Sequence, residues 1–202
     1  MGDVMIGVDI GQKRDPTAIA VAEREWRRRN DLRDDHYLIR YLQRLPLGTP
    51  YPTVAERLEE IVTDVRKHAR SGPSVYVDAT GVGQPVVDLL EAVETPIYAV
   101  YFTHGDRRSV NRRQITLGKA WLVSRLQALL QTGRIHLPRT EEADVLANEL
   151  LDYELRVSEN ANDTYGAFKV GSHDDLVTAL GLAVQAKPQP RPRVHLIHAR
   201  SE

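Results

Sequence analysis

Four aspartates occupy positions from which a folded chain could bring their carboxylates together. Asp9 and Asp78 each end a short apolar run, whereas Asp174 and Asp175 open a segment whose apolar residues have helical spacing. Carboxylates that converge repel one another unless cations lie between them. Mg²⁺ and Mn²⁺ are the cations that prefer carboxylate oxygens as ligands. These residue types at these positions therefore predict a site for hard divalent metal ions.

Such a site could hydrolyse phosphodiester bonds. Two divalent ions roughly 4 Å apart can activate an attacking water and stabilise the leaving oxygen of an in-line displacement. We expect two divalent ions, Mg²⁺ or Mn²⁺, because both are bound by carboxylate and water oxygens. Asp9 would bridge the two ions, while Asp78 would complete one and Asp175 the other. Asp174 and Asp15 are expected as additional ligands.

Simpler roles remain open for each of these acids. Aspartate is common in turns, and Asp78 could also cap the helix that follows it. Ser172 and Asp175 have the spacing of a capping box, in which an acid reaches back to a backbone amide near the helix start. That motif does not account for Asp174, although the helix dipole favours acids throughout a first turn. Four acids at the ends of core elements fit a metal site better than separate coincidences.

The apolar pattern predicts three antiparallel strands followed by alternating helices and strands. The predicted strands are residues 4–10, 17–26, 36–45, 74–79 and 96–102, and the predicted helices are residues 53–70, 84–92, 117–132, 140–151 and 173–186. A small β-hairpin is expected from residues 152–157 and 164–170, closed around Asn160 to Asp163. This order predicts an α/β fold with a mixed five-stranded sheet, flanked by helices and built from a meander followed by parallel crossovers.

The first and fourth predicted strands decide whether the acids meet. In this topology they can pair in parallel, and both then end at the same edge of the sheet. Neighbouring strands lie about 5 Å apart, so Asp9 and Asp78 would face one another across that spacing. This separation suits one bridging divalent ion and is too small for two uncompensated negative charges.

The composition is that of an ordinary globular domain. Hydrophobic residues make up 42% of the chain and charged residues 27%, and no apolar run is long enough for a membrane-spanning helix. No signal peptide is visible. The absence of cysteine excludes disulfides, thiolate zinc sites and a cysteine nucleophile, and it fits an intracellular protein. We expect one domain over residues 1–186 and an extended tail rich in proline and arginine over residues 187–202.

A formal net charge of −1 conceals local clusters of basic residues. Arg107, Arg108, Arg112 and Arg113 flank a stretch poor in apolar residues, and Lys169 lies on the predicted hairpin near the acids. Solvated surface side chains are the simpler interpretation. The alternative is contact with double-stranded DNA through backbone phosphates, which depends on charge rather than on base reading. A phosphate-binding face is compatible with near-zero net charge if the two signs are separated in space.

Several motifs resemble the nuclease domain of phage large terminase subunits, which has a ribonuclease H-like fold. They are Gly7-Val8-Asp9-Ile10-Gly11 with Asp15-Pro16-Thr17-Ala18, Val77-Asp78-Ala79-Thr80-Gly81-Val82-Gly83, Lys119-Ala120-Trp121-Leu122-Val123-Ser124 with the following segment to Ile135, Asn162-Asp163-Thr164-Tyr165-Gly166, and His173-Asp174-Asp175-Leu176-Val177. The resemblance runs through most of the chain, and the last two motifs are the most specific.

The resemblance implies a metal-dependent endonuclease that cuts concatemeric viral DNA during genome packaging, in the cytoplasm of an infected bacterial host. It implies that Asp9, Asp78 and Asp175 are the catalytic metal-binding acids, with Asp174 and Asp15 as accessory ones. The implied partners are double-stranded DNA and a packaging ATPase domain, small terminase or portal protein. No association with a membrane is expected. The chain has no Gly-x-x-x-x-Gly-Lys-Ser/Thr loop, so we expect no ATPase motor within it.

Three other functions remain open. A Holliday-junction-resolvase-like nuclease would use similar acids, as a dimer that cuts symmetrically. A phosphotransferase related to actin or sugar kinases would use Asp9-Ile10-Gly11, but it would need two copies of the fold. A catalytically silent DNA-binding or packaging assembly module would keep the fold without the chemistry, and the complete set of acids argues against it.

Overall fold

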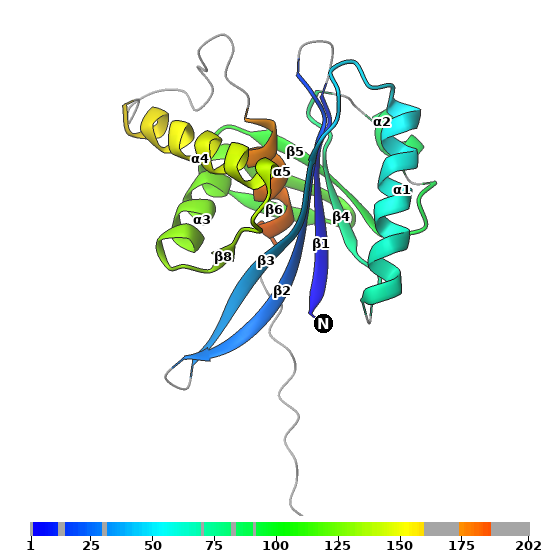
Figure 1. The fold of residues 1–202 in the computed structure, drawn as a ribbon. Coiled ribbons are helices and arrows are strands. Elements are labelled where there is room, and N and C mark those ends of the chain that lie inside the picture. Colours follow the sequence, from blue (N-terminus) through cyan, green and yellow to red (C-terminus); the bar gives the residue numbers. More distant parts are fainter. Residues whose placement is uncertain are drawn as a thin grey trace, which may run out of the picture.

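The chain folds around a mixed sheet of eight strands, with helices on both faces (Figure 1). The computed structural model describes residues 2–11, 15–29, 32–69, 71–81, 84–90, 92–159 and 174–186. The strands are β1 (Asp3–Asp9), β2 (Ala18–Arg29), β3 (Leu32–Arg44), β4 (Ser74–Asp78), β5 (Ile97–Thr103), β6 (Arg108–Asn111), β7 (Gln114–Gly118) and β8 (Ile135–His136). Their order across the sheet is β6-β7-β5-β4-β1-β2-β3-β8.

The helices form two layers with separate hydrophobic cores. They are α1 (Tyr51–His68), α2 (Gln84–Leu90), α3 (Lys119–Gln131), α4 (Glu141–Glu159) and α5 (Asp175–Val184). Helices α1 and α2 cover one face of the sheet, and α3, α4 and α5 cover the other (Figure 1). Helix α1 buries Val54, Leu58, Ile61 and Val62, whose spacing of three and four residues forms one apolar stripe. None of the helices in the described ranges is both long and apolar enough to cross a membrane.

The pairing of β1 confirms the predicted topology. This strand pairs antiparallel with β2 and in parallel with β4, in a register that sets Val8 opposite Val77. Asp9 and Asp78 are the next residues of the two strands and therefore end at the same edge of the sheet. All five predicted strands are present, and β6, β7 and β8 extend the sheet beyond them. The three additional strands are short, and β6 is largely exposed, so none of them carries a long apolar run that would reveal it.

One predicted element is wrong. Residues 152–157, expected as a hairpin strand, belong to α4, which continues to Glu159. Leu146 and Leu150, four residues apart, are both buried, as expected for one face of a helix. Acidic residues occupy the first turn, where the positive end of the helix dipole stabilises them. The helical period therefore prevails over the local strand pattern. The second predicted hairpin strand, residues 164–170, lies outside the described residues, as does the tail over residues 187–202.

Helix α5 is almost wholly buried and rests directly on β1. Its apolar residues run without interruption from Leu176 to Ala183 except at Thr178 and Gly181, and Thr178 is the only residue of the helix that is not buried. A Cβ atom placed on Gly7 would lie 1.9 Å from the backbone oxygen of Ala179. Glycine at this strand position therefore allows the two backbones to touch. This close approach fixes the start of α5 relative to the end of β1.

The long β2–β3 ribbon contains a β-bulge. Ala18 pairs with Arg44 and Val21 with Tyr41, but Ala22 pairs with Ile39, so Arg40 is an extra residue on β3. An extra residue reverses the alternation of side chains between the two faces of a strand. Ile39 faces the core beneath α5, and beyond the bulge Leu42 faces that core instead of Tyr41. Arg44, two residues further on, consequently shares the α5 face.

Candidate metal centre

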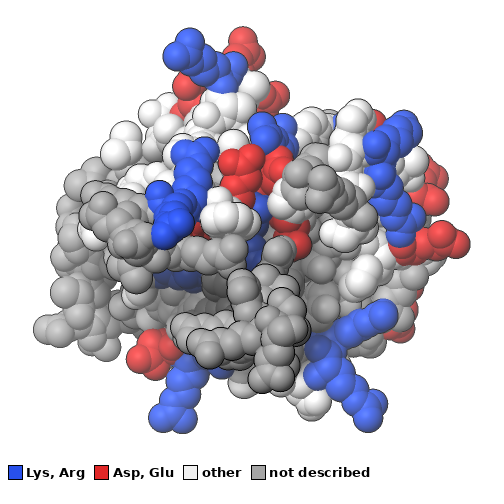
Figure 2. Space-filling model, turned by 90° about the horizontal axis from the view of Figure 1, so that it is seen from below, with Lys and Arg blue, Asp and Glu red and all other residues white. Residues whose placement is uncertain are grey.

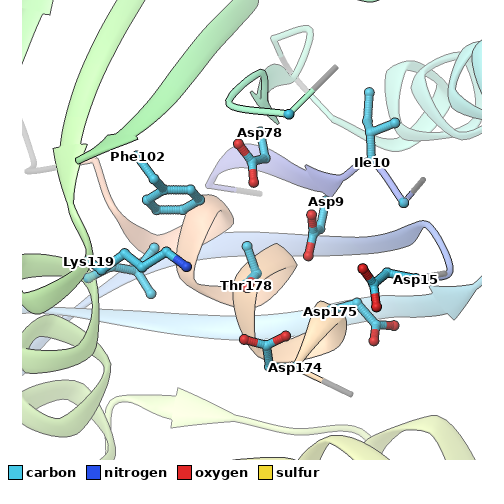
Figure 3. A pocket seen from close by; sticks show the side chains of 12 residues that line it. Asp9, Ile10, Asp15, Asp78, Phe102, Lys119, Asp174, Asp175 and Thr178 are labelled. Carbon is cyan, nitrogen blue, oxygen red and sulfur yellow. The ribbon is translucent and has the colours of Figure 1, made fainter. Parts of the chain in front are cut away.

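A cleft of about 250 Å³ opens at the edge of the sheet where β1 and β4 end (Figure 3). Its lining contains all five aspartates that were predicted as metal ligands, which are Asp9, Asp15, Asp78, Asp174 and Asp175. The remaining lining residues are Ile10, Gly11, Gly81, Phe102, Lys119, Leu122 and Thr178. One cleft therefore receives carboxylates from two strand ends, a loop and a helix start, which lie far apart in the sequence.

Asp78 is held in a turn that is anchored to the neighbouring strand. One of its carboxylate oxygens, Oδ1, accepts a hydrogen bond from the Thr80 backbone N–H at 2.8 Å. The Thr80 hydroxyl oxygen in turn accepts one from the Phe102 N–H on β5, also at 2.8 Å. Asp78 is thus a turn residue, as the simpler interpretation held, and it also lines the cleft.

Asp15 reaches the cleft through a tightly closed loop. The Gly11 N–H donates to the Thr17 hydroxyl oxygen at 3.0 Å, which brings the two sides of the loop together. A Cβ atom on Gly11 would lie 2.0 Å from the Asp15 backbone oxygen. Glycine therefore permits the approach that carries Asp15 to the same edge as Asp9.

The acids at the start of α5 are not used as helix caps. Asp174 is the N-cap residue and makes no side-chain capping hydrogen bond, while Asp175 is the first residue of the helix. The capping box considered as a simpler role for Asp175 would place it three residues inside the helix, and the observed helix start excludes it. Asp175 is only 3% exposed and accepts a hydrogen bond from Arg44 Nε at 2.5 Å. It nevertheless lines the cleft, and Figure 3 shows it beside the other aspartates.

The electrostatics of the cleft favour protonation or a bound cation. Burial raises the pKa of Asp9 well above its usual range, and the negative charges of Asp78, Asp174 and Asp175 raise it further. Burial also raises the pKa of Asp174. Lys119 acts in the opposite direction on both groups. The negative charge in the cleft is therefore only partly compensated by the protein itself.

The donor set fits Mg²⁺ or Mn²⁺. Five carboxylates line the cleft and no histidine lies among its lining residues, a composition that suits hard cations bound by oxygen. In the described part of the chain, no three acidic or histidine side chains are already gathered into a closed ligand set. Arg44 holds Asp175 instead. Binding a metal ion would thus require the carboxylates to turn toward it.

Lys119 is a cleft residue that the sequence reasoning did not single out. It is the first residue of α3 and directly follows β7, and its side chain points toward the aspartates (Figure 3). The Nζ atom lies 5.9 Å from the centroid of the Phe102 ring. Because β7 runs parallel to β5, the residue after β7 arrives at the same edge as the acids. A sequence analysis that identified β7 as a parallel strand would have placed Lys119 at this edge.

The four arginines predicted to bind DNA do not form one cluster. Arg107 is exposed and lies near the start of α3, since its backbone oxygen accepts the Gly118 N–H. The Arg108 Nε–H donates to Gln185 at 2.6 Å, and the guanidinium lies over the Trp121 ring.

Arg112 and Arg113 occupy the exposed turn between β6 and β7. The turn contacts β5 through a hydrogen bond from the Ala99 N–H to the Arg113 backbone oxygen, and neither arginine lines the cleft. Lys169 lies outside the described residues. Among the described residues visible in Figure 2, basic and acidic side chains are interspersed rather than gathered in one basic patch.

Comparisons with known proteins agree with the fold and the motifs. The family model for the terminase RNase H-like domain matches residues 6–187. The large terminase nuclease from thermophilic phage G20c is 21% identical, with a TM-score of 0.52 over 91% of this chain and 81% of that one. The Mn-soaked human cytomegalovirus terminase nuclease domain is 14% identical, with a TM-score of 0.56 over 90% of this chain and 81% of that one. A search of curated proteins returned no match.

At such identities the two solved structures establish the fold alone, which is the predicted RNase H-like fold. The family model carries more, because it spans nearly all of the described chain and includes both the strand ends and the helix start that line the cleft. The chain belongs to the family of terminase RNase H-like domains, the nuclease family that its motifs indicated.

Proposed function

We propose that this chain is a metal-dependent endonuclease that cuts double-stranded concatemeric DNA during viral genome packaging. The observation that carries the proposal is the convergence of five aspartates from distant parts of the chain in one cleft. A structural role for so many acids at one edge is unfavourable, because burial and then their mutual repulsion raise the pKa of Asp9. A site that binds divalent cations turns this repulsion into affinity.

The acids of the cleft have separate roles in this proposal. Asp9 would hold both ions, Asp78 would contribute to the site of one and Asp175 to that of the other, and Asp174 and Asp15 would be accessory ligands. When bound, two Mg²⁺ or Mn²⁺ ions supply activation of the attacking water and stabilisation of the leaving oxygen. The carboxylates fix where this happens because they are mounted on paired strands and a buried helix.

Two cations are suited to the DNA backbone. Lys119 points into the cleft, where its ammonium group could contact the phosphate beside the cut. Arg107 is exposed near the start of α3, at the same end of the sheet. Both contacts would read charge rather than base identity, and no described helix offers a row of base-reading side chains. We therefore expect little sequence preference.

The packaging context defines the expected partners. The family match supports association with a packaging ATPase domain, a small terminase or a portal protein, in the cytoplasm of an infected bacterial host. Residues 1–186 would form the nuclease domain and residues 187–202 an appended tail. The family match favours this function over a Holliday-junction resolvase or a kinase-like phosphotransferase, and the retained acids argue against a silent assembly module.

Plasmid cleavage tests the proposal. Supercoiled plasmid is incubated with the protein and Mn²⁺ or Mg²⁺, alongside Asp78→Asn, Asp175→Asn and the control Asp64→Asn, which changes an exposed acid on α1. We expect nicking and linearisation by the wild type and the control. The cutting rate of the two cleft variants should fall by more than the roughly 10- to 100-fold that is typical when a residue hydrogen-bonded to a metal ligand is replaced. Intact plasmid with either metal, or full activity in both cleft variants, would contradict the proposal.

A further inference from the structure

Arg44 connects the metal-ligand candidate Asp175 to a second buried acid. Its Nε–H donates to Asp175 Oδ2 at 2.5 Å, and its Nη2 group donates to Glu149 Oε1 on α4. The Asp175 side chain is 4% exposed, that of Glu149 10% and that of Arg44 27%. Burial alone would lower the pKa of Arg44, but its bonds to the two acids outweigh this effect and raise it. The single positive charge of Arg44 is thus shared between two buried carboxylates.

The register of the sheet aims Arg44 at the cleft. Asp9 lies opposite Ala18 on β2, and Ala18 lies opposite Arg44 on β3. Directly paired residues of neighbouring strands share a face, and two strand spacings amount to about 10 Å. An extended arginine side chain spans much of that distance. Ala18 between them has too small a side chain to block the way.

The Glu149 carboxylate can accept a second hydrogen bond from Arg44 in addition to the one it accepts here. Its second oxygen, Oε2, is buried without a hydrogen bond of normal geometry. Burial raises the pKa of Glu149 to about 7, against the opposing effects of Arg44 and, more weakly, of the Val177 N–H. An under-used buried acceptor is unfavourable, and a planar guanidinium that can present two parallel N–H groups is its best partner.

We propose that Arg44 and Glu149 act as a positioning pair that releases the Asp175 carboxylate for metal binding. Without metal, Arg44 neutralises Asp175 and competes with a divalent ion for it. When an ion attracts the Asp175 carboxylate, Arg44 moves its Nε–H toward Glu149, whose Oε2 receives it. This inference rests on the proposed metal-binding role of Asp175. It adds that Glu149, on a different helix, sets how easily Asp175 becomes available.

The proposal predicts effects of opposite sign for the two members of the pair. In Glu149→Gln the arginine loses its alternative anionic partner and stays on Asp175, so Mn²⁺ binding should weaken by about tenfold. In Arg44→Gln the competitor is gone, so Mn²⁺ binding should strengthen by a similar factor although the metal-free protein becomes less stable. A static brace that merely orients Asp175 predicts weaker binding in both variants.

The test measures metal binding without DNA. Mn²⁺ titrations of the full chain by calorimetry at pH 8, with melting curves in the presence and absence of Mn²⁺, compare the wild type with Glu149→Gln and Arg44→Gln. Controls are Glu142→Gln, an exposed acid on the same helix, and Arg134→Gln, which breaks the ion pair between Arg134, just before β8, and Asp34 on β3. If Arg44→Gln fails to fold, Arg44→Met replaces it, because methionine also removes the competing charge and should strengthen Mn²⁺ binding. If Glu149→Gln fails to fold, Glu149→Met replaces it, because methionine also removes the alternative partner of Arg44 and should weaken Mn²⁺ binding.

The outcomes separate this inference from the proposed nuclease function. Unchanged Mn²⁺ affinity in Glu149→Gln, or weaker binding in Arg44→Gln, overturns the positioning pair even if the wild type cuts plasmid. Opposite shifts in a protein that binds Mn²⁺ but leaves plasmid intact support the pair and overturn the nuclease. A wild type that binds no Mn²⁺ overturns both.

Discussion

Asp9 and Asp78, at the ends of paired strands, are held differently from Asp174 and Asp175, at the start of a helix. Backbone hydrogen bonds of the β1–β4 ladder determine where the strand acids lie. The helix acids depend on packing of α5 against β1 and, for Asp175, on an ion pair with Arg44. A ladder resists displacement, whereas a side-chain pair can exchange partners. The cleft therefore combines a fixed half with an adjustable half.

The contact at Gly7 joins these two halves, and breaking it should have the largest effect. Gly7→Leu places a side chain where the Ala179 backbone already lies, so α5 must leave the sheet. We expect a loss of more than about 4 kcal/mol in the free energy of unfolding, since backbone cannot yield as a side chain can. Urea unfolding measures it.

Gly72→Ala is the matched control, because a Cβ there would meet only the Arg66 Nε atom at 3.7 Å. Its effect should stay within about 0.5 kcal/mol. Equal stability of the Gly7 and Gly72 variants would show that the two halves are not joined at Gly7.

Lys119 faces both halves of the cleft, and its removal should have an intermediate effect. Lys119→Met keeps the length and the packing on Phe102 but removes the positive charge beside Asp9 and Asp174. We expect plasmid cutting to fall by about 10- to 100-fold, the usual size for one electrostatic contact at a reaction centre. Cutting rates at saturating Mg²⁺ measure it, with Lys67→Met, an exposed lysine on α1, as the control. Undiminished cutting would remove Lys119 from the site.

The pH dependence of stability should be the smallest effect. The pKa values of Asp9, Asp174 and Glu149 are all raised, so the folded protein binds protons more tightly than the unfolded chain. The stability contributed by Glu149 is complete below its ordinary pKa of 4.5 and is lost as pH rises through about 7. Melting temperatures of the metal-free protein should thus decline between pH 5 and pH 8.

Added Mg²⁺ should reduce this decline, because the ion compensates the ionised carboxylates, and Glu149→Gln should reduce it without metal. Melting temperatures that rise across the same pH interval would contradict the proposed charge balance.

The fixed half of the cleft could be predicted from the sequence, and the adjustable half only in part. Asp9 and Asp78 end apolar runs, so strand pattern and topology together place them at one edge. Asp175 could be predicted to lie near them, but not its partner, because Arg44 and Glu149 are far apart in the chain. Lys119 was missed since β7 is too short to stand out.

The wrong hairpin at residues 152–157 has a similar origin. Their own pattern fits a strand, whereas the helix that contains them begins at Glu141 and owes its stability to the buried Leu146 and Leu150. Local patterns predict an element well when its own residues bury it. They fail when a preceding turn or a distant partner decides.

The extra residue at Arg40 changes how a sequence alignment of this ribbon should be read. Deleting it would leave Ile39 opposite Ala22 and Tyr41 opposite Val21, so Leu42 and Arg44 would keep the α5 face of the sheet. A relative that lacks this one residue would therefore still direct the arginine at the end of the strand toward the aspartates. Positions in this strand should be matched by counting back from its last residue rather than forward from its first.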